Sequence, residues 1–220
     1  SLGQIDTGSL SNLFSYVPIQ FTDSDLSPFK HKVKTILLPR VDVTADFPNV
    51  SRTDFRQKQI KIDFGAKSLS LPMTISFKLI PRKLNLNETI MESSSFKIKQ
   101  NNKSVEFLST ADNKKILSSG SELKTTSCNH YAFVISKSNI TIYINGRRHQ
   151  VSNNLSFNGI SKNLTVGKYS GKVWDLRIFN TDISQSNIAK LSESCDDQFS
   201  MQSPFDGYQK YLCGVYKCIW

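Results

Sequence analysis

Short runs of alternating apolar and polar residues recur along this chain, and they constrain its fold more than any other feature. The clearest pair covers residues 131–136 and 140–144, and Asn145-Gly146 follows directly. An Asn-Gly dipeptide favours the type I′ turn, which joins two antiparallel strands in a hairpin. This part of the chain is therefore predicted to be a meander of antiparallel strands.

A third run, residues 172–179, alternates in the same way. Side chains of a strand alternate between its two faces, which predicts Trp174, Leu176 and Ile178 on one face and Asp175 and Arg177 on the other. We expect Trp174 to lie in the core. Residues 184–191 then indicate a short polar helix. The order of elements is hairpin, strand and helix.

Four earlier runs extend the pattern toward the amino terminus. They lie at residues 60–64, 75–79, 96–98 and 105–107, with polar loops between them. Residues 34–43 supply one more expected strand, which Pro39 confines to the edge of a sheet. Residues 1–27 are irregular, and we expect them to drape over the sandwich or to form an edge strand. Strands at such intervals predict an all-β sandwich.

A set of positions in residues 128–184 matches a known family. The family carries Trp-His-His-Val-Ala, Tyr-Val-Asn-Gly, Gly and Gly-x-Ile-x-Asp-x-Arg-Ile-Tyr-Asn-x-x-Leu-Ser, and the matches here are His130, Ala132, Tyr143, Asn145, Gly146, Gly167, Gly171, Asp175, Arg177, Ile178, Asn180 and Ser184. With these residues the chain resembles the laminin G-like and pentraxin-like domains of the concanavalin A-like lectin/glucanase superfamily. Cys128 stands where the family usually has tryptophan. Residues 142–147 and 178–188 are also similar to the jelly-roll subdomain of the clostridial neurotoxin binding region, which has the same fold.

The resemblance implies an all-β, concanavalin A-like jelly-roll β-sandwich with one short helix near the C-terminus. A chain of 220 residues is long enough for one such core. We expect a single laminin G-like domain over residues 1–220, with its core at about 28–195 and a disulfide-tethered segment at 196–220. The chain has no apolar run of about 18 residues and no signal-peptide pattern, so we expect any membrane anchor to lie outside this sequence.

Cysteines and N-x-S/T motifs both favour an exported protein. The cysteines are even in number and form no C-x-x-C pair, which favours disulfides over zinc; they are Cys128, Cys195, Cys213 and Cys218. Three pairings are open, and we favour one that ties the carboxyl-terminal segment to the domain. The candidate glycosylation sites are Asn49, Asn87, Asn102, Asn139, Asn154 and Asn163. We therefore expect a secreted or cell-surface glycoprotein.

No catalytic pattern is present. Glucanases of this superfamily carry E-x-D-x-E on one strand, whereas none of the five glutamates here has an aspartate two positions away. The chain also lacks H-E-x-x-H and G-x-S-x-G, and the glycine spacing of GKYSGK does not fit a phosphate loop. We expect a non-enzymatic protein without a cofactor. Calcium is the one metal that the resemblance leaves open; Asp175 lies within a strand, which favours a structural role, and Asp196-Asp197 lies outside the matched region.

The chain is strongly basic, with a net charge of +10. Turns at one end of a sandwich converge, so we predict an anion-binding rim made of Arg147, Arg148, Lys162, Lys168 and Lys172. Laminin G-like domains frequently bind heparan sulfate, and the resemblance therefore implies a sulfated glycan as ligand. A solvated basic surface without a ligand is the alternative. No nucleic-acid-binding motif accompanies the charge.

Two functional hypotheses follow. The first is a non-enzymatic adhesion or recognition module that binds a protein receptor or an anionic, heparan sulfate-like glycan at the cell surface. The second is a structural subunit of a larger surface complex that binds no glycan. The carboxyl-terminal sequence YLCGVYKCIW, with its aromatic residues and two cysteines, favours the second hypothesis.

Overall fold

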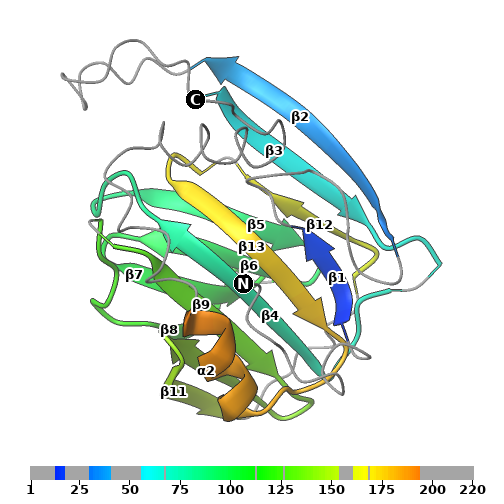
Figure 1. The fold of residues 1–220 in the computed structure, drawn as a ribbon, viewed down its shortest axis with the longest axis vertical. Coiled ribbons are helices and arrows are strands. Elements are labelled where there is room, and N and C mark those ends of the chain that lie inside the picture. The colour runs from blue at the N-terminus through cyan, green and yellow to red at the C-terminus, as the bar shows by residue number, and fades with distance from the viewer. Residues whose placement is uncertain are drawn as a thin grey trace, which may run out of the picture.

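The computed structural model describes residues 13–17, 30–40, 56–66, 68–111, 113–125, 127–153, 161–167 and 169–193. These residues form two antiparallel sheets that pack face to face, with one helix near the end of the described chain (Figure 1). The predicted all-β sandwich is therefore confirmed. No helix among the described residues is long and apolar enough to cross a membrane.

One sheet has six strands. Their order across the sheet is β1 (Leu13–Val17), β13 (Lys172–Phe179), β4 (Met73–Ile80), β9 (Asn129–Ile135), β10 (Asn139–Ile144) and β11 (Arg147–Asn153). The pair β10 and β11 is the hairpin predicted at Asn145-Gly146, and both turn residues have the positive φ that a type I′ turn requires.

The other sheet has seven strands. Their order is β2 (Lys32–Arg40), β3 (Arg56–Asp63), β12 (Asn163–Val166), β5 (Asn87–Ser93), β6 (Phe96–Asn101), β7 (Ser104–Ser109) and β8 (Lys115–Ser118). The strand that contains Pro39 is β2, and it lies at the edge of this sheet as predicted.

The core lies between the two sheets. Every second side chain of β6 is buried, whereas all side chains of β4 except the last are buried. Aromatic rings connect the two sheets. Phe107 of β7 lies with its ring centroid 5.6 Å from that of Phe133 of β9, and Phe133 stacks on Phe77 of β4. Such pairs add to the stabilisation that burial of their apolar area provides.

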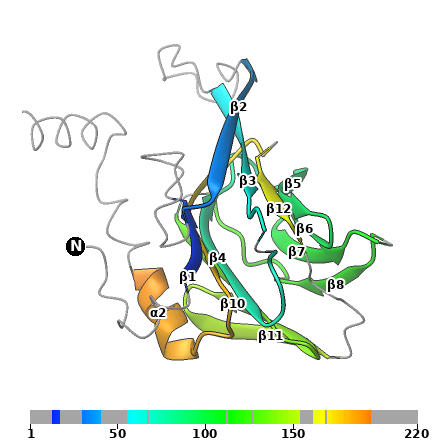
Figure 2. The same cartoon turned by 90° about the vertical axis from the view of Figure 1, so that its right-hand side faces the viewer.

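The helix α2 (Gln185–Glu193) covers the outer face of the six-stranded sheet (Figure 2). Its Ile188 and Leu191 are buried against Ala132 and Phe179 of that face. The predicted helix at 184–191 is thus confirmed.

One predicted face assignment is wrong. Leu176 and Ile178 lie in the core between the sheets. The side chain of Trp174 lies on the outer face of the six-stranded sheet, in a cluster with Cys128 and Ile80. The cause is a β-bulge after Trp174, at which Asp175 adopts a φ of 51°. A bulge adds one residue to a strand and reverses the alternation beyond it.

Candidate functional site

Among the parts of the chain that the structure describes, five loops meet at one end of the sandwich. Antiparallel pairing fixes which connections share an end, and the loops that meet at this end are residues 81–86, 102–103, 119–128, 145–146 and 167–171. They join β4 to β5, β6 to β7, β8 to β9, β10 to β11 and β12 to β13. The connections between β3 and β4, β5 and β6, β7 and β8, and β9 and β10 lie at the opposite end.

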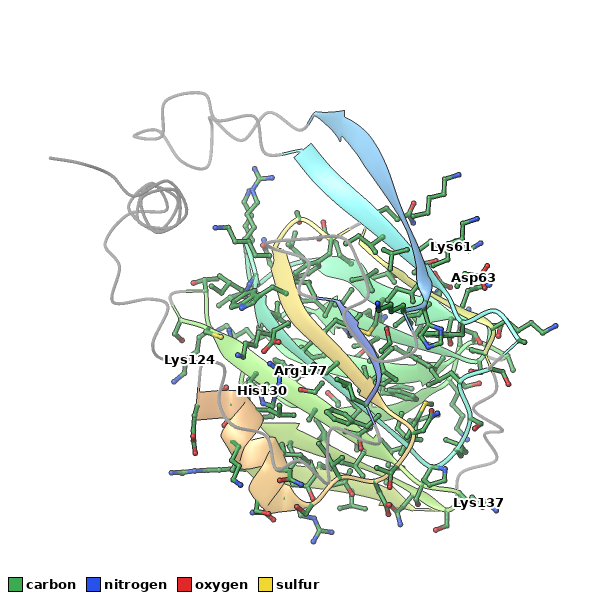
Figure 3. The ribbon with its side chains drawn as sticks, turned by 45° about the vertical axis from the view of Figure 1, so that its right-hand side comes forward. Lys61, Asp63, Lys124, His130, Lys137 and Arg177 are labelled. Atoms are coloured by element: carbon green, nitrogen blue, oxygen red, sulfur yellow. The ribbon has the colours of Figure 1, made fainter. Side chains whose placement is uncertain are left out.

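The loops at this end are rich in cations. We call the following set the cationic end: Arg82, Lys83, Lys103, Lys124, Arg147, Arg148 and Lys172. All of them are exposed except the half-buried Arg82. Among the described residues, the exposed carboxylates nearby are those of Glu122 in the 119–128 loop and Glu193 at the end of α2. Figure 3 shows Lys124 at this end and Lys137 at the opposite end.

Gln100, a fully buried residue of β6, holds two of these loops together. Its Nε2 donates hydrogen bonds to the backbone oxygens of Lys83, at 2.7 Å, and of Asn102, at 2.9 Å. The backbone nitrogen of Leu123 donates to the backbone oxygen of Lys103 at 3.0 Å. The backbones of the loops that carry Lys83, Lys103 and Lys124 are therefore joined by hydrogen bonds.

Two asparagines organise the neighbouring part of the end. Asn129 is 1% exposed. Its Nδ2 donates hydrogen bonds to the backbone oxygens of Lys124, Ser127 and Leu79. Its Oδ1 accepts a hydrogen bond from the backbone nitrogen of Lys124. Asn145 Oδ1 accepts a hydrogen bond from the backbone nitrogen of His130 at 2.8 Å. The side chain of Asn145 thereby joins the 145–146 turn to β9.

The 167–171 loop is tied to the other sheet. Tyr169 Oη donates to Gln100 Oε1 at 2.6 Å, and burial raises the pKa of Tyr169, so its hydroxyl keeps the proton that it donates. Glu88 Oε2 accepts hydrogen bonds from the Ser170 backbone nitrogen, at 2.8 Å, and from Ser170 Oγ, at 2.6 Å. Lys172 begins β13 directly after this loop.

The structure separates the residues of the predicted anion-binding rim. Arg147, Arg148 and Lys172 belong to the cationic end, and the four strand spacings between β11 and β13 correspond to about 19 Å. Lys162 precedes β12 and lies at the opposite end, and Lys168 lies outside the described residues. Sequence reasoning missed Arg82, Lys83, Lys103 and Lys124, although each lies in a loop between predicted or observed strands.

A buried polar cluster lies on the outer face of the six-stranded sheet. Asp175 accepts from Lys78 Nζ at 2.8 Å and from both Nε and an Nη of Arg177 at 2.9 Å. Both of its carboxylate oxygens are engaged by cations, so Asp175 does not fit a calcium site. Among the described residues, no group of three or more His, Cys, Asp and Glu side chains is placed to hold a metal. The absence of a cofactor stays a prediction, with calcium held by distant loops as the open alternative.

His130 belongs to the same face (Figure 3). It is 1% exposed, and its Nε2 lies 2.9 Å from Ser76 Oγ. Burial, followed by the positive charges of Lys78 and Arg177, lowers the pKa of His130 to about 3. The structure thus shows a completely buried histidine that stays neutral at physiological pH.

A polar pocket of about 300 Å³ lies on the seven-stranded sheet beside the cationic end. Its lining residues are Gln59, Asn87, Glu88, Thr89, Glu92, Thr165 and Gly167. No glutamate in the sequence has an aspartate two positions away, which is the spacing of the glucanase motif. Two glutamates, Glu88 and Glu92, nevertheless both line this pocket. Each is held by another residue: Glu88 by Ser170, and Glu92 by Lys97, whose Nζ lies 3.1 Å away.

The predicted modification sites are described only in part. Cys128 is disulfide-bonded, and the other three cysteines lie outside the described residues, so the pairing stays open. Asn87 and Asn102 are exposed, whereas Asn139 and Asn163 are half-buried. Asn49 and Asn154 lie outside the described residues.

Comparison with known proteins agrees with this geometry. Residues 57–189 match the family model described as the concanavalin A-like lectin/glucanases superfamily, a laminin G-type model. The resemblance drawn from residues 128–184 is thereby confirmed. No curated protein matches the chain in sequence.

Solved structures with the same fold include binding domains of botulinum neurotoxins. The ligand binding domain of serotype D in complex with N-acetylneuraminic acid is 16% identical, with a TM-score of 0.65 over 88% of this chain and 53% of that chain. The binding domain of neurotoxin DC in complex with rat synaptotagmin II is 18% identical, with a TM-score of 0.63 over 86% of this chain and 52% of that chain. This chain thus spans about half the length of those chains, and at these identities the likeness shows the fold alone.

Proposed function

The chain belongs to the concanavalin A-like lectin/glucanases superfamily, and from this premise we propose that it is a non-enzymatic recognition module whose cationic end binds an anionic glycan outside the cell. The observation that carries the proposal is the convergence of seven cationic side chains on loops that buried polar residues hold in place. The cysteines and N-x-S/T motifs support the extracellular location.

The chemistry of the end suits sulfate and carboxylate groups. Arginine presents a planar fork that binds such groups in a bidentate way, and lysine adds point charges around it. Because the loop backbones are already fixed, binding would order only the side chains. A ligand that spans the end would contact Arg147 and Lys172 together, which requires an extended polyanion and not a single small anion.

Binding of this kind depends on ionic strength. Exposed charge pairs contribute roughly 0.2 to 1 kcal/mol each and are screened by salt. Several weak contacts along one chain would add up to useful affinity, and they would be lost together as salt is raised. A sulfated glycan is therefore expected to dissociate in a salt gradient.

A protein receptor is the second candidate ligand for this end. One of the similar structures is described in complex with rat synaptotagmin II. Another is described in complex with N-acetylneuraminic acid, an anionic sugar, which supports the glycan instead. A structural subunit that binds no glycan is the remaining alternative. The experiment below distinguishes these three proposals.

The test is retention of the glycosylated protein on immobilised heparin. The variant Arg147→Ala/Arg148→Ala removes two charges from the cationic end. The control Lys137→Ala/Lys162→Ala removes the same number of charges from exposed residues at the opposite end. We expect the first variant to lower affinity roughly two- to thirtyfold, and the control to change it little.

Equal losses of heparin affinity in both variants would indicate a non-specific effect of net charge and would refute a binding site at the cationic end. No retention of the native protein at physiological salt would refute the glycan. In that case, cross-linking on the cell surface would show whether a stable, salt-resistant complex with another polypeptide exists, as a structural subunit requires.

A further inference from the structure

The polar pocket on the seven-stranded sheet contains a candidate glycosylation site in its wall. Asn87-Glu88-Thr89 is an N-x-T motif, and all three residues line the pocket. Asn87 is the first residue of β5 and is exposed. Asn87 and Thr89 pair with Asn101 and Lys99 of β6, so they lie on the same face of the strand, toward solvent.

The rest of the pocket is lined with hydrogen-bonding groups. Gln59 of β3 and Thr165 of β12 lie across from β5, and Glu92 closes the side away from the cationic end. Among the residues that the structure describes, no aromatic or aliphatic side chain lines the pocket. Its volume of about 300 Å³ is at the lower end of the range in which pockets hold small organic ligands.

The exposed carboxylate of Glu92 is suited to accept hydrogen bonds from sugar hydroxyls and from acetamido N–H groups, whereas Glu88 pairs with the buried Gln100 and lies on the opposite face of β5 from Asn87. Glu88 is fixed by two hydrogen bonds from Ser170, and the side chain of Glu92 is 48% exposed while its Oε1 contacts Lys97. The amides of Gln59 and Asn87 and the hydroxyl of Thr165 provide further donors and acceptors. The lining therefore matches a ligand made of hydroxyl and acetamido groups.

We propose that Asn87 carries an N-linked glycan whose first sugars occupy this pocket. The modification forms a bond between Asn87 Nδ2 and the anomeric carbon of a lipid-pyrophosphate-linked oligosaccharide. The bond between that carbon and the pyrophosphate oxygen breaks, the lipid pyrophosphate leaves, and Nδ2 gives up one proton to solvent. The attached glycan then lies against Gln59, Thr165 and Glu92.

A glycan bound in this pocket affects where external ligands can bind. A glycan in the pocket covers the part of the seven-stranded sheet that borders the cationic end. External ligands would then be directed to the loops at that end. The inference does not depend on the heparin-binding proposal, because it concerns a different face and a different chemical group.

The test uses the protein made in a eukaryotic secretory system. Site occupancy is measured by mass spectrometry, and the rate of release by peptide N-glycosidase is measured on the folded protein. Asn102 is the matched control, since it is also exposed, begins an N-x-S motif and lies outside the pocket. We expect release from Asn87 to be about two- to tenfold slower than release from Asn102, as one or two hydrogen bonds would cause.

A variant of the pocket distinguishes direct contacts between the glycan and the pocket from general steric protection of the Asn87 site. Gln59→Ala/Thr165→Val leaves the N-x-T motif intact and removes polar groups that the sugars would contact. We expect it to accelerate release from Asn87 toward the rate at Asn102, with release from Asn102 unchanged. An unoccupied Asn87, equal release from both sites in the native protein, or no effect of the variant would each overturn the proposal.

Discussion

Gln100 shows how a single buried side chain shapes the candidate site. It joins the loop of Lys83 to the turn of Asn102 and accepts a hydrogen bond from Tyr169. Nothing in the sequence distinguishes it, because it occupies an inward position of β6 where alternation predicts an apolar residue. Buried polar groups of this kind depend on partners far away in the chain, and a local pattern does not reveal such partners.

Replacing Gln100 with leucine is expected to lower the free energy of unfolding by on the order of 3 kcal/mol, since it leaves several buried polar groups without partners. Tyr169→Phe removes one of the same hydrogen bonds and serves as the control, with an expected loss of about 1 kcal/mol. Urea denaturation measures both losses. A Gln100→Leu protein within about 0.5 kcal/mol of the native one would contradict the role assigned to Gln100.

His130 predicts a dependence of stability on pH. Its ordinary pKa of 6.5 falls to about 3 in the fold, because His130 is buried and lies near the positive charges of Lys78 and Arg177. Between these two values the unfolded chain binds a proton that the folded chain excludes. The free energy of unfolding should therefore decrease as pH falls from 6.5 toward 3, by roughly 1 kcal/mol per pH unit, with no contribution from His130 above pH 6.5.

Denaturation at several pH values checks this expectation. In His130→Asn the slope between pH 6.5 and 3 should be reduced, whereas His149→Asn, a change at an exposed histidine, should keep the native slope. Identical slopes in the native protein and in His130→Asn would show that His130 is protonated in the folded state.

Elements with a strong periodicity were predictable, and short ones were not. The strand at 172–179, the Asn145-Gly146 hairpin and the helix after it are confirmed. Strands β8 and β12 have four residues each, which is too short to show a period. The bulge at Asp175 was also not predictable, because the alternation of apolar and polar residues does not show where an extra residue enters a strand.

The turn between β10 and β11 is also a packing surface for α2. A Cβ placed on Gly146 would lie 2.6 Å from Ser192 Oγ and 3.0 Å from Ala189 Cα, and the φ of Gly146 is +78°. Gly146→Ala should therefore lower the free energy of unfolding by about 2 kcal/mol or more, through backbone strain and contact with the helix.

Gly65→Ala is the matched control, since Gly65 has a φ of +61° and nothing within 4 Å of its Cβ position. Its expected loss is about 1 kcal/mol, from backbone strain alone. Thermal or urea denaturation measures both variants. Equal losses of unfolding free energy in the two variants would mean that the Gly146 turn makes no close contact with α2.

At the scale of the whole molecule, the function depends on which loops share an end. The sequence predicted one rim for the Arg147 turn and the Lys168 loop; Arg147 and Lys172 lie at the same end, but four strand spacings apart. The same reasoning misplaced Lys162 and missed Lys83, Lys103 and Lys124, because strand order within the two sheets decides which end a loop occupies. That order depends on the pairing of strands that are far apart in the sequence, which the two-residue alternation of apolar and polar side chains does not encode.

Lysine footprinting tests the cationic end most directly. The glycosylated protein is acetylated under native conditions with and without heparin, and the reaction at each lysine is quantified by mass spectrometry. We predict that heparin protects Lys83, Lys103, Lys124 and Lys172, whereas Lys114, Lys137 and Lys162 at the opposite end react as before. Equal protection at both ends, or protection of the opposite end alone, would contradict a binding site at the cationic end.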